Sequence, residues 1–417
     1  MHPFDDRGVS GGSVRPDGGT ESGFRFAYEP GAVVYGAGRV SDLERELAAI
    51  GVERGLVVAG ETVGTTDAVV EPVREGLGDR LADVFAGTTP AKRLAEAAAA
   101  ADAYEDADAD AFVALGGGSS LDVAKVASAL VASGQSYEGA LNDLERAGTV
   151  PVPGGALPPI VAVPTTLAGA DLSVVAGITA RRDDGPVVRG GVFDGRLMPE
   201  ALVYDPDLFR TTPAGVLCAS AMNGFDKGLE TVYARNSTPV TDGTALRGLR
   251  LLARGLPALG AGDRDADTMH DAIVGTILVQ YGASRGDGTT LSVIHAFGHG
   301  LARGYDVQQG AAHGVIAPHA VRDIFDAVDG RRDELAEALG VDADADGPDE
   351  TADAVVDAID GIREALGLPG RLRDTAIPRE DLPDVARAVV DDGFMPNRPR
   401  GYDPTAEDIE AVLERAW

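Results

Sequence analysis

A glycine-rich turn between a predicted strand and a predicted helix is the strongest chemical signal in the chain. The sequence FVALGGGSSLDVAK (112–125) runs from an apolar strand directly into three glycines, a serine and a helix. Glycines let a ligand approach the backbone, and the amino end of a helix presents unpaired N–H groups and a positive dipole end. The turn therefore predicts a pyrophosphate cradle, although it lacks the GxGxxG fingerprint. A turn that only tightens the strand–helix joint is the structural alternative.

A second polar loop follows the next predicted strand. In VAVPTTLAGADLS (161–173) the strand leads into a proline, two threonines and small residues. Paired hydroxyls at a strand end can bind a ribose or a phosphate, and small residues leave room for a nicotinamide ring. A hydroxyl turn without a ligand is the alternative for this loop on its own.

Two pairs of polar residues are spaced to share helical faces. Asn223 and Lys227 stand four residues apart in a stretch with helical spacing, and His295 and His299 repeat that spacing. Side chains four residues apart lie on the same face of a helix. Four of the six histidines cluster in one short window and are His295, His299, His313 and His319. A histidine taken alone is more often structural than functional.

The charge balance of the chain is strongly acidic. Acidic residues outnumber basic ones by 67 to 36, which gives a net charge of −31, and such a surface repels nucleic acid and anionic membranes. The hydrophobic fraction of 44% argues against general disorder, so the acidity predicts a halophilic protein. Only Lys92, Lys125 and Lys227 are lysines, and we expect each retained lysine to have a specific role.

The sequence also bears on where the protein works. The single cysteine, Cys218, excludes an intramolecular disulfide and a cysteine-based metal cluster, and it fits a reducing compartment. No run approaches the ~20 apolar residues of a membrane span, and the amino terminus lacks an apolar signal-peptide core. We therefore expect a soluble, cytoplasmic protein.

Short apolar runs alternate with helical patterns in the first half of the chain. The runs predicted to be buried strands are residues 32–36, 54–60, 111–118 and 159–166. The patterns predicted to be intervening helices are residues 43–51, 91–105 and 120–134. This alternation implies a parallel sheet covered on both faces.

The character of the sequence changes after DPDLFRTTP (205–213). Strand signals largely disappear, and patterns with helical spacing run to the carboxyl terminus. We therefore expect a disordered tail at 1–23, an α/β domain at 24–206 and a helical domain at 207–417. The acidic stretch 341–350 predicts a solvated loop, because it lacks the closing glutamate of a calcium loop.

The two polar loops together resemble the iron-containing alcohol dehydrogenase family, whose members carry GGGSxxDxxK followed by a PTTxxGS-like loop. The resemblance covers nearly the whole chain, and the segments PTTLAGADLSVVAGIT, SAMNGF and GAAHGVIAPH look most like the maleylacetate reductase branch. It implies an α/β amino-terminal domain with a parallel sheet, of the dehydroquinate synthase-like or iron alcohol dehydrogenase fold. It also implies an all-α carboxyl-terminal domain and a substrate cleft between the two.

The resemblance also implies which residues bind the NAD(P) cofactor. By position they are Gly116, Gly117, Gly118 and Ser119 at the pyrophosphate, with Asp122, Thr165, Thr166 and Leu167 nearby. NAD-selective relatives tend to end an earlier strand in an acidic residue that repels a 2′-phosphate, and Gly60 stands at that position here. We therefore favour NADP(H) slightly over NAD(H), although Glu61 follows directly.

The main departure from the family lies at its metal site. Relatives hold one divalent ion, Fe²⁺ or Zn²⁺, with an Asp and a His four residues apart on one helix and two further histidines. The matching positions here are Asn223, Lys227, His295 and Gln309. Amides are weak neutral ligands, and an ammonium has no lone pair and repels a cation. We therefore expect no catalytic metal, and a shifted alignment that recruits Asp226 and His299 is the alternative.

The sequence thus predicts an NAD(P)H-dependent oxidoreductase that reduces a small aldehyde or ketone. Lys227, beside Asn223, would polarise the carbonyl oxygen in place of a metal, and His299 or His295 would deliver the proton. One alternative is a lyase or isomerase with Lys227 as a Schiff-base amine, and another is a non-catalytic nucleotide-binding relative.

The predicted partners are a small-molecule substrate and further copies of the chain. The likeness to maleylacetate reductases suggests a carboxylate-bearing substrate. Candidate partners of that carboxylate are Arg189, Arg303, Arg398 and Arg400. The resemblance further implies a homodimer or a larger homo-oligomer.

Overall fold

The computed structural model describes residues 23–182, 185–302, 305, 307–341 and 347–417. The predicted tail at 1–23, except for residue 23, falls outside these residues, and so do Arg303 and residues 342–346 of the predicted loop at 341–350. The end of that loop prediction is wrong, because residues 348–350 form the first turn of helix α14 (Pro348–Ala365).

The described chain divides into two compact units. The first comprises Tyr28–Thr166 and Ala170–Pro213. The second comprises residues 23–27, the short stretch Leu167–Gly169 and the whole of Ala214–Trp417.

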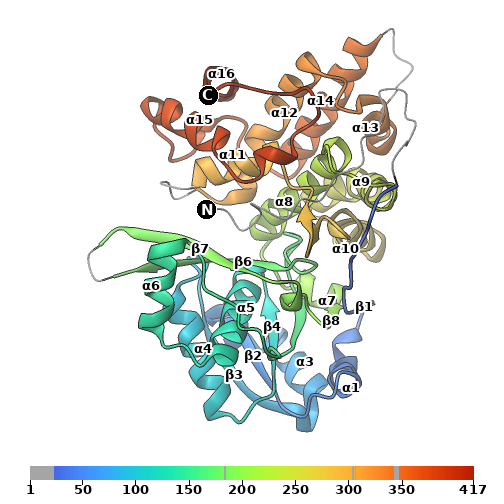
Figure 1. Cartoon of the computed structure of the whole chain (residues 1–417). Helices are drawn as coiled ribbons and strands as arrows, with labels where there is room; N and C mark the ends of the chain where they lie inside the picture. Colours follow the sequence, from blue (N-terminus) through green and yellow to red (C-terminus); the bar gives the residue numbers. More distant parts are fainter. Residues whose placement is uncertain (1–22, 183–184, 303–304, 306, 342–346) are drawn as a thin grey trace. The chain divides into compact units, whose positions relative to one another are not determined.

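A six-stranded parallel sheet forms the centre of the first unit, with the strand order β1-β8-β5-β4-β2-β3 (Figure 1). Its strands are β1 (Ala32–Tyr35), β2 (Gly55–Gly60), β3 (Leu81–Thr88), β4 (Ala111–Gly116), β5 (Ile160–Pro164) and β8 (Ala201–Tyr204). The four predicted strands are confirmed as β1, β2, β4 and β5. Strands β3 and β8 were not predicted.

Helices and a hairpin complete the first unit. The helices are α1 (Leu43–Ala49), α2 (Glu61–Thr65), α3 (Asp67–Leu77), α4 (Leu94–Asp106), α5 (Gly118–Ser133), α6 (Tyr137–Ala147) and α7 (Pro206–Arg210). The three predicted helices are confirmed as α1, α4 and α5. Strands β6 (Val175–Arg181) and β7 (Val187–Phe193) pair antiparallel outside the main sheet, and α6 lies beside β7 (Figure 1).

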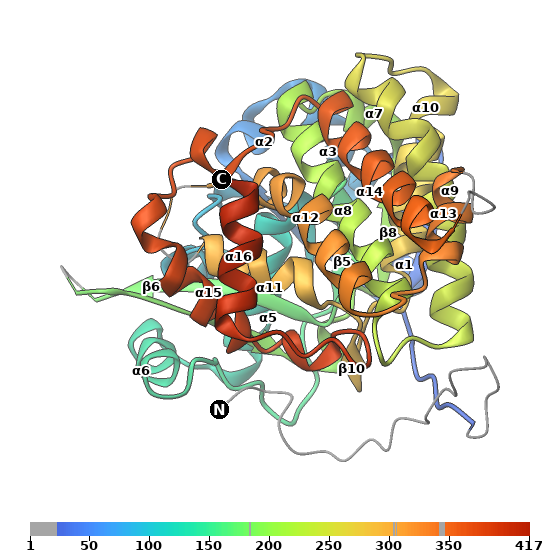
Figure 2. The ribbon, with the colours of Figure 1, turned by 90° about the horizontal axis from the view of Figure 1, so that it is seen from above.

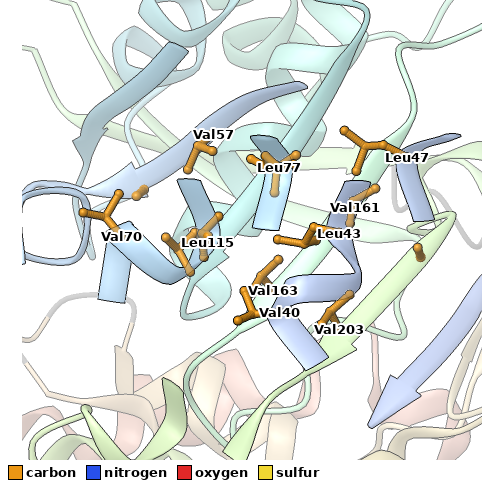
Figure 3. Close-up of a cluster of buried hydrophobic side chains, with 14 of the residues drawn as sticks. Val40, Leu43, Leu47, Val57, Val70, Leu77, Leu115, Val161, Val163 and Val203 are labelled. Carbon is orange, nitrogen blue, oxygen red and sulfur yellow. The ribbon is translucent and has the colours of Figure 1, made fainter. Parts of the chain in front are cut away.

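Both faces of the sheet are buried, as its continuous apolar strands require. On one face, Val57, Leu115, Val163 and Val203 pack against the 3₁₀ turn Arg39–Asp42, helix α1 and helix α3 (Figure 3). The residues that alternate with them point to the opposite face. There Phe112 stacks on Tyr104 of α4 with ring centroids 4.7 Å apart. Helices therefore cover the sheet on both sides.

The sheet brings the ends of its strands together. Gly116 at the end of β4 is in register with Pro164 at the end of β5, and β2 ends nearby at Gly60. In an open parallel sheet, the loops beyond the carboxyl ends of the strands form the ligand-binding edge. Both polar loops found in the sequence therefore leave the sheet at this edge.

The second unit is helical. Its elements are α8 (Ala214–Tyr233), α9 (Pro239–Gly260), α10 (Ala266–Gln280), β9 (Ser284–Arg285), β10 (Gly288–Thr289), α11 (Val293–Ala302), α12 (Gln309–Ala327), α13 (Arg332–Leu339), α14 (Pro348–Ala365), α15 (Leu382–Val390) and α16 (Ala406–Ala416). Helix α16 packs on α12 and α15 (Figure 2). Within the described residues, no helix is both long enough and apolar enough to cross a membrane.

Helix α8 is the central helix of this unit. From Leu217 to Tyr233 every residue except Asn223 is buried, and α8 packs against α9, α10 and α12. Glycines bring these helices close: a Cβ at Gly228 would lie 2.7 Å from Leu249 Cδ2, and one at Gly248 only 2.6 Å from Val279 Cγ1. Since α8 is enclosed by other helices, its polar side chains are held rigidly.

Candidate active site

The glycine turn joins β4 to the amino end of α5. Gly116 has a φ of +126°, which favours glycine, whereas Gly117 caps the helix and Gly118 begins it. A Cβ at Gly117 would lie 3.2 Å from Thr166 Cγ2, and one at Gly118 would lie 3.1 Å from Ala170 Cβ. Because the three glycines have no side chains, a ligand can reach the main-chain N–H groups at the positive end of this 16-residue helix. The turn fits a dinucleotide pyrophosphate.

The threonine loop lies directly against the glycine turn. The N–H of Thr165 donates to the carbonyl of Gly116 at 2.9 Å, and the side chain of Thr166 lies beside Gly117. The hydroxyl of Thr212 donates to the carbonyl of Thr165 at 2.7 Å, which holds the loop from the other side. The structure therefore brings together the two motifs that sequence reasoning assigned to one cofactor.

The remaining predicted cofactor residues have different surroundings. Ser119 is half-buried in the first turn of α5, and Gly60 caps α2. Asp122 is buried and pairs with the ammonium of Lys92 at 2.5 Å. Asp122 therefore fixes one of the three lysines of the chain.

Leu167 groups with the helical unit rather than with the other predicted cofactor residues. Its side chain is fully buried, and its N–H donates to Ser220 Oγ on α8 at 3.0 Å. Leu167 therefore anchors the threonine loop to α8.

Lys227 lies on the face of α8 where the family resemblance implies a metal ligand. Its Nζ donates to the carbonyl of Ala168 at 2.9 Å and to that of Gly169, and the residue is only 8% exposed. Asn223, one turn earlier, is half-buried, and no hydrogen-bond partner of its Oδ1 occurs among the described residues. An ammonium and an amide on one face of α8 thus occupy the two positions at which the family resemblance implies metal ligands.

A buried carboxylate holds His295 of α11. Glu230 Oε2 lies 2.5 Å from His295 Nδ1, and its Oε1 accepts the main-chain N–H of the same histidine at 2.9 Å. Burial raises the pKa of Glu230 to about 7 and lowers the pKa of His295 well below its usual value. This carboxylate links α8 to the amino end of α11 and fixes the imidazole ring.

A second carboxylate–imidazole pair lies next to the first. Asp226 Oδ2 is 2.9 Å from His313 Nδ1, and the rings of His313 and His295 meet edge to face with centroids 4.7 Å apart. Burial raises the pKa of Asp226 well above its usual range and lowers the pKa of His313 to about 3. A Cβ at Gly298 would lie 2.0 Å from His313 Nε2. The imidazole ring of His313 can therefore pack against α11 only because residue 298 is glycine.

The buried His313 predicts a specific loss of stability in acid. Its pKa is about 3 in the folded chain against an ordinary 6.5, so below pH 6.5 the unfolded chain binds a proton that the folded chain does not. Lowering the pH from 6.5 to 4.5 should therefore cost about 2 kcal/mol at this group. Urea denaturation should show His313→Gln losing less stability than the wild type by about that amount. Equal losses in the two proteins would contradict the linkage.

His299 is the most accessible histidine of this set. Its side chain is 40% exposed, and its Nδ1 lies 3.0 Å from Oδ2 of Asp392, whose side chain is 2% exposed. The ring lies against Phe394, with centroids 5.0 Å apart. With the carboxylate of Asp392 at Nδ1, Nε2 is the ring nitrogen that would exchange a proton with a substrate.

The described residues do not fit a divalent metal. No group of three or more His, Cys, Asp or Glu side chains that could hold an ion occurs among them. Of the four positions that hold the metal in relatives, only His295 carries a metal-binding side chain. Lys227 and Asn223 of α8 supply an ammonium and an amide, and Gln309, at the start of α12, is a half-buried neutral residue. The alternative with Asp226 and His299 does not form such a group, because Asp226 pairs with His313 and His299 pairs with Asp392.

Sequence reasoning missed the carboxylates that hold the histidines. Glu230 is four residues after Asp226, so their common helical face was a signal that the sequence offered. Asp392 had no comparable signal, because it lies far from His299 along the chain. Of the predicted carboxylate partners, Arg398 bonds Asp403, whereas Arg189 and Arg400 are exposed. No contact in the part of the chain that the structure describes assigns Arg189, Arg398 or Arg400 to the site.

Two models of one family match almost the whole chain. Residues 30–206 match the model described as iron-containing alcohol dehydrogenase, and residues 217–417 match the carboxyl-terminal model of that family. The chain belongs to the iron-containing alcohol dehydrogenase family. Membership makes it an oxidoreductase and confirms the fold expected from the sequence.

Individual relatives align over nearly their full length. The chain is 26% identical to the NAD-dependent methanol dehydrogenase of Bacillus methanolicus, covering 93% of this chain and 98% of the relative. It is 28% identical to a maleylacetate reductase of Sphingobium indicum, covering 94% and 97%. The solved structure of a 1,3-propanediol oxidoreductase superposes with a TM-score of 0.84 at 23% identity, covering 94% of this chain and 100% of that one, which shows the shared fold.

Proposed function

We propose that this protein is an NAD(P)H-dependent reductase of a small aldehyde or ketone that works without a resident catalytic metal. One observation carries the proposal: a fixed ammonium, Lys227, and an amide, Asn223, occupy the face of α8 where the family resemblance implies metal ligands. The ammonium supplies a positive charge there and disfavours the binding of a cation.

The cofactor assignment rests on the glycine turn and on the relatives. Gly116, Gly117 and Gly118 leave helix N–H groups uncovered, and the threonine loop closes on them. The methanol dehydrogenase relative is named as NAD-dependent. Gly60 favours NADP(H) slightly, because no carboxylate at that position repels a 2′-phosphate.

In the proposed reaction, side chains of the protein would stabilise the developing negative charge and donate the proton. Bound NAD(P)H supplies the hydride that reduces a carbonyl carbon. The ammonium of Lys227 stabilises negative charge developing on the carbonyl oxygen, since a fixed cation away from water acts strongly. His299 donates a proton from Nε2 to that oxygen while Asp392 holds its Nδ1. The products are an alcohol and the oxidised cofactor, and His295 stays fixed by Glu230.

The geometry favours this reaction over Schiff-base chemistry. A Schiff base forms from an unprotonated amine. Lys227 instead donates to two main-chain carbonyls, an arrangement that stabilises its protonated form. The retained glycine and threonine motifs likewise favour a nucleotide-using enzyme over a protein that only kept the fold.

The finer features of the enzyme are part of the same proposal. Its relatives include maleylacetate reductases, which supports a carboxylate-bearing substrate. Its net charge of −31 supports a salt-adapted, cytoplasmic protein that binds neither nucleic acid nor membranes. We expect a homodimer or a larger homo-oligomer, as the family resemblance implies.

The decisive test is turnover in the presence of a chelator. NADPH and NADH oxidation would be followed in molar KCl against small aldehydes, keto acids and oxo-dicarboxylates, with and without EDTA. We expect turnover of at least one substrate, unchanged by EDTA. Turnover that EDTA abolishes and added Fe²⁺ or Zn²⁺ restores would overturn the metal-free mechanism. Absence of turnover with every substrate would overturn the reductase assignment.

A further inference from the structure

Residues 167–169, which directly follow Thr165 and Thr166, pack against one face of α8. Ser220, Gly224 and Lys227 are spaced four and three residues apart, so they line one side of the helix. Along that side, Ser220 Oγ accepts the N–H of Leu167, and Lys227 Nζ donates to the next two carbonyls. Residues 167–169 are thus bound to α8 at each successive position.

Gly224 sets how closely this stretch approaches the helix. A Cβ at Gly224 would lie 2.3 Å from the carbonyl oxygen of Leu167. Since Cβ atoms do not approach other heavy atoms within 3 Å, only glycine permits this contact. Gly169, at the end of the stretch, has a φ of +66°, and a Cβ there would lie 3.4 Å from Lys227 Nζ. Both glycines are therefore required for the ammonium to reach its two carbonyls.

A second buried lysine holds the segment further along the chain. Lys125 of α5 is fully buried, and its Nζ donates to the carbonyl of Ser173 at 2.6 Å and to that of Val175 at 3.2 Å. Between the two lysines, Asp171 accepts the hydroxyl of Tyr204 at 2.7 Å. Two of the three lysines in the chain thus bind main-chain carbonyls of the single segment 168–175.

We infer that Lys227, Gly224 and Ser220 are positioning residues for the cofactor, assisted by Lys125. They fix residues 167–169, which directly follow Thr165 and Thr166 in the chain, and thereby restrict the conformations open to the loop that carries those two threonines. This inference rests on the proposed nucleotide-dependent function. It gives Lys227 a role besides its charge, because the same ammonium that faces the chemistry also shapes the cofactor site.

Gly224→Ala tests the inference, because it displaces the segment while keeping the ammonium. The Leu167 carbonyl must move by roughly 1 Å, and such a misplacement can cost about 10²-fold in rate. We expect faster hydrogen–deuterium exchange of residues 165–175 in the cofactor-free protein, NADH or NADPH binding weaker by about tenfold, and kcat lower by about 10²-fold. The matched control is Gly215→Ala on the same helix, where a Cβ meets nothing within 4 Å.

Further variants keep the test decisive if Gly224→Ala fails to fold. Ser220→Ala removes only the acceptor of the Leu167 N–H, and Lys125→Met removes the second anchor; each should speed exchange in the same segment and weaken cofactor binding. A purely structural role would lower the melting temperature and leave cofactor affinity unchanged. Unchanged exchange in all three variants would overturn the inference. Exchange is read without cofactor or substrate, so it is independent of whether the proposed reductase activity is correct.

Discussion

Lys227→Met is expected to lower kcat/KM for carbonyl reduction by roughly 10²–10³-fold. The variant removes the one cation on the face of α8 that carries Asn223, and Met keeps the length and apolar stem of the side chain. Negative charge on the substrate oxygen then develops without a fixed counter-charge. The same change releases the carbonyls of Ala168 and Gly169. Cofactor affinity should therefore fall as well, by about tenfold, as in Gly224→Ala.

Comparison with two other variants separates the charge of Lys227 from its positioning role. Gly224→Ala keeps the ammonium but displaces residues 167–169. The amount by which kcat/KM falls further in Lys227→Met than in Gly224→Ala therefore measures the contribution of the charge. Arg74→Met, which removes an exposed cation of α3, is the control for lost charge at a distance. Steady-state kinetics and cofactor titration are the measurements. Wild-type turnover in Lys227→Met would remove this residue from the mechanism.

The buried strands were predictable because both of their faces are covered. Strands β2, β4 and β5 lie inside the sheet, so they are continuous apolar runs. Strand β3 escaped prediction because it is the edge strand: most of its residues are only half-buried, and it carries Asp83. Strand β8 was missed although its four residues are all buried and strand β1, of the same length, was predicted.

The site was predictable where residues close in sequence act together. The glycine turn and the threonine loop each lie within a few residues and were found directly in the sequence, whereas the pairs on α8 and α11 were assigned through the family resemblance. The partners of the histidines come from distant parts of the chain: 65 residues separate Glu230 from His295, and 93 separate His299 from Asp392. Pairing at such separations depends on tertiary packing. The hydrogen bonds from Lys227 to the carbonyls of Ala168 and Gly169 could not be predicted either, because every residue has a main-chain carbonyl and the sequence does not show which ones accept a bond.

His299→Gln should reduce kcat by about 10²-fold or more, because a positioned general acid contributes roughly 10²–10⁴-fold. Gln can still form a hydrogen bond with Asp392 but cannot deliver a proton near neutral pH. The loss should therefore appear in kcat, while cofactor affinity stays at the wild-type value. Since the side chain of His299 is 40% exposed, the fold should tolerate this change.

The pH dependence of the rate decides whether His299 acts as the acid. In the wild type, kcat should fall as pH rises through the titration of the group that donates the proton, and His299→Gln should remove that dependence along with the rate. Asp392→Asn, which leaves the imidazole but takes away the carboxylate at Nδ1, should lower kcat less than His299→Gln does and should keep a pH dependence. A wild-type pH profile in His299→Gln would assign the proton to another group, and His295 with its carboxylate Glu230 would be the next residue to vary.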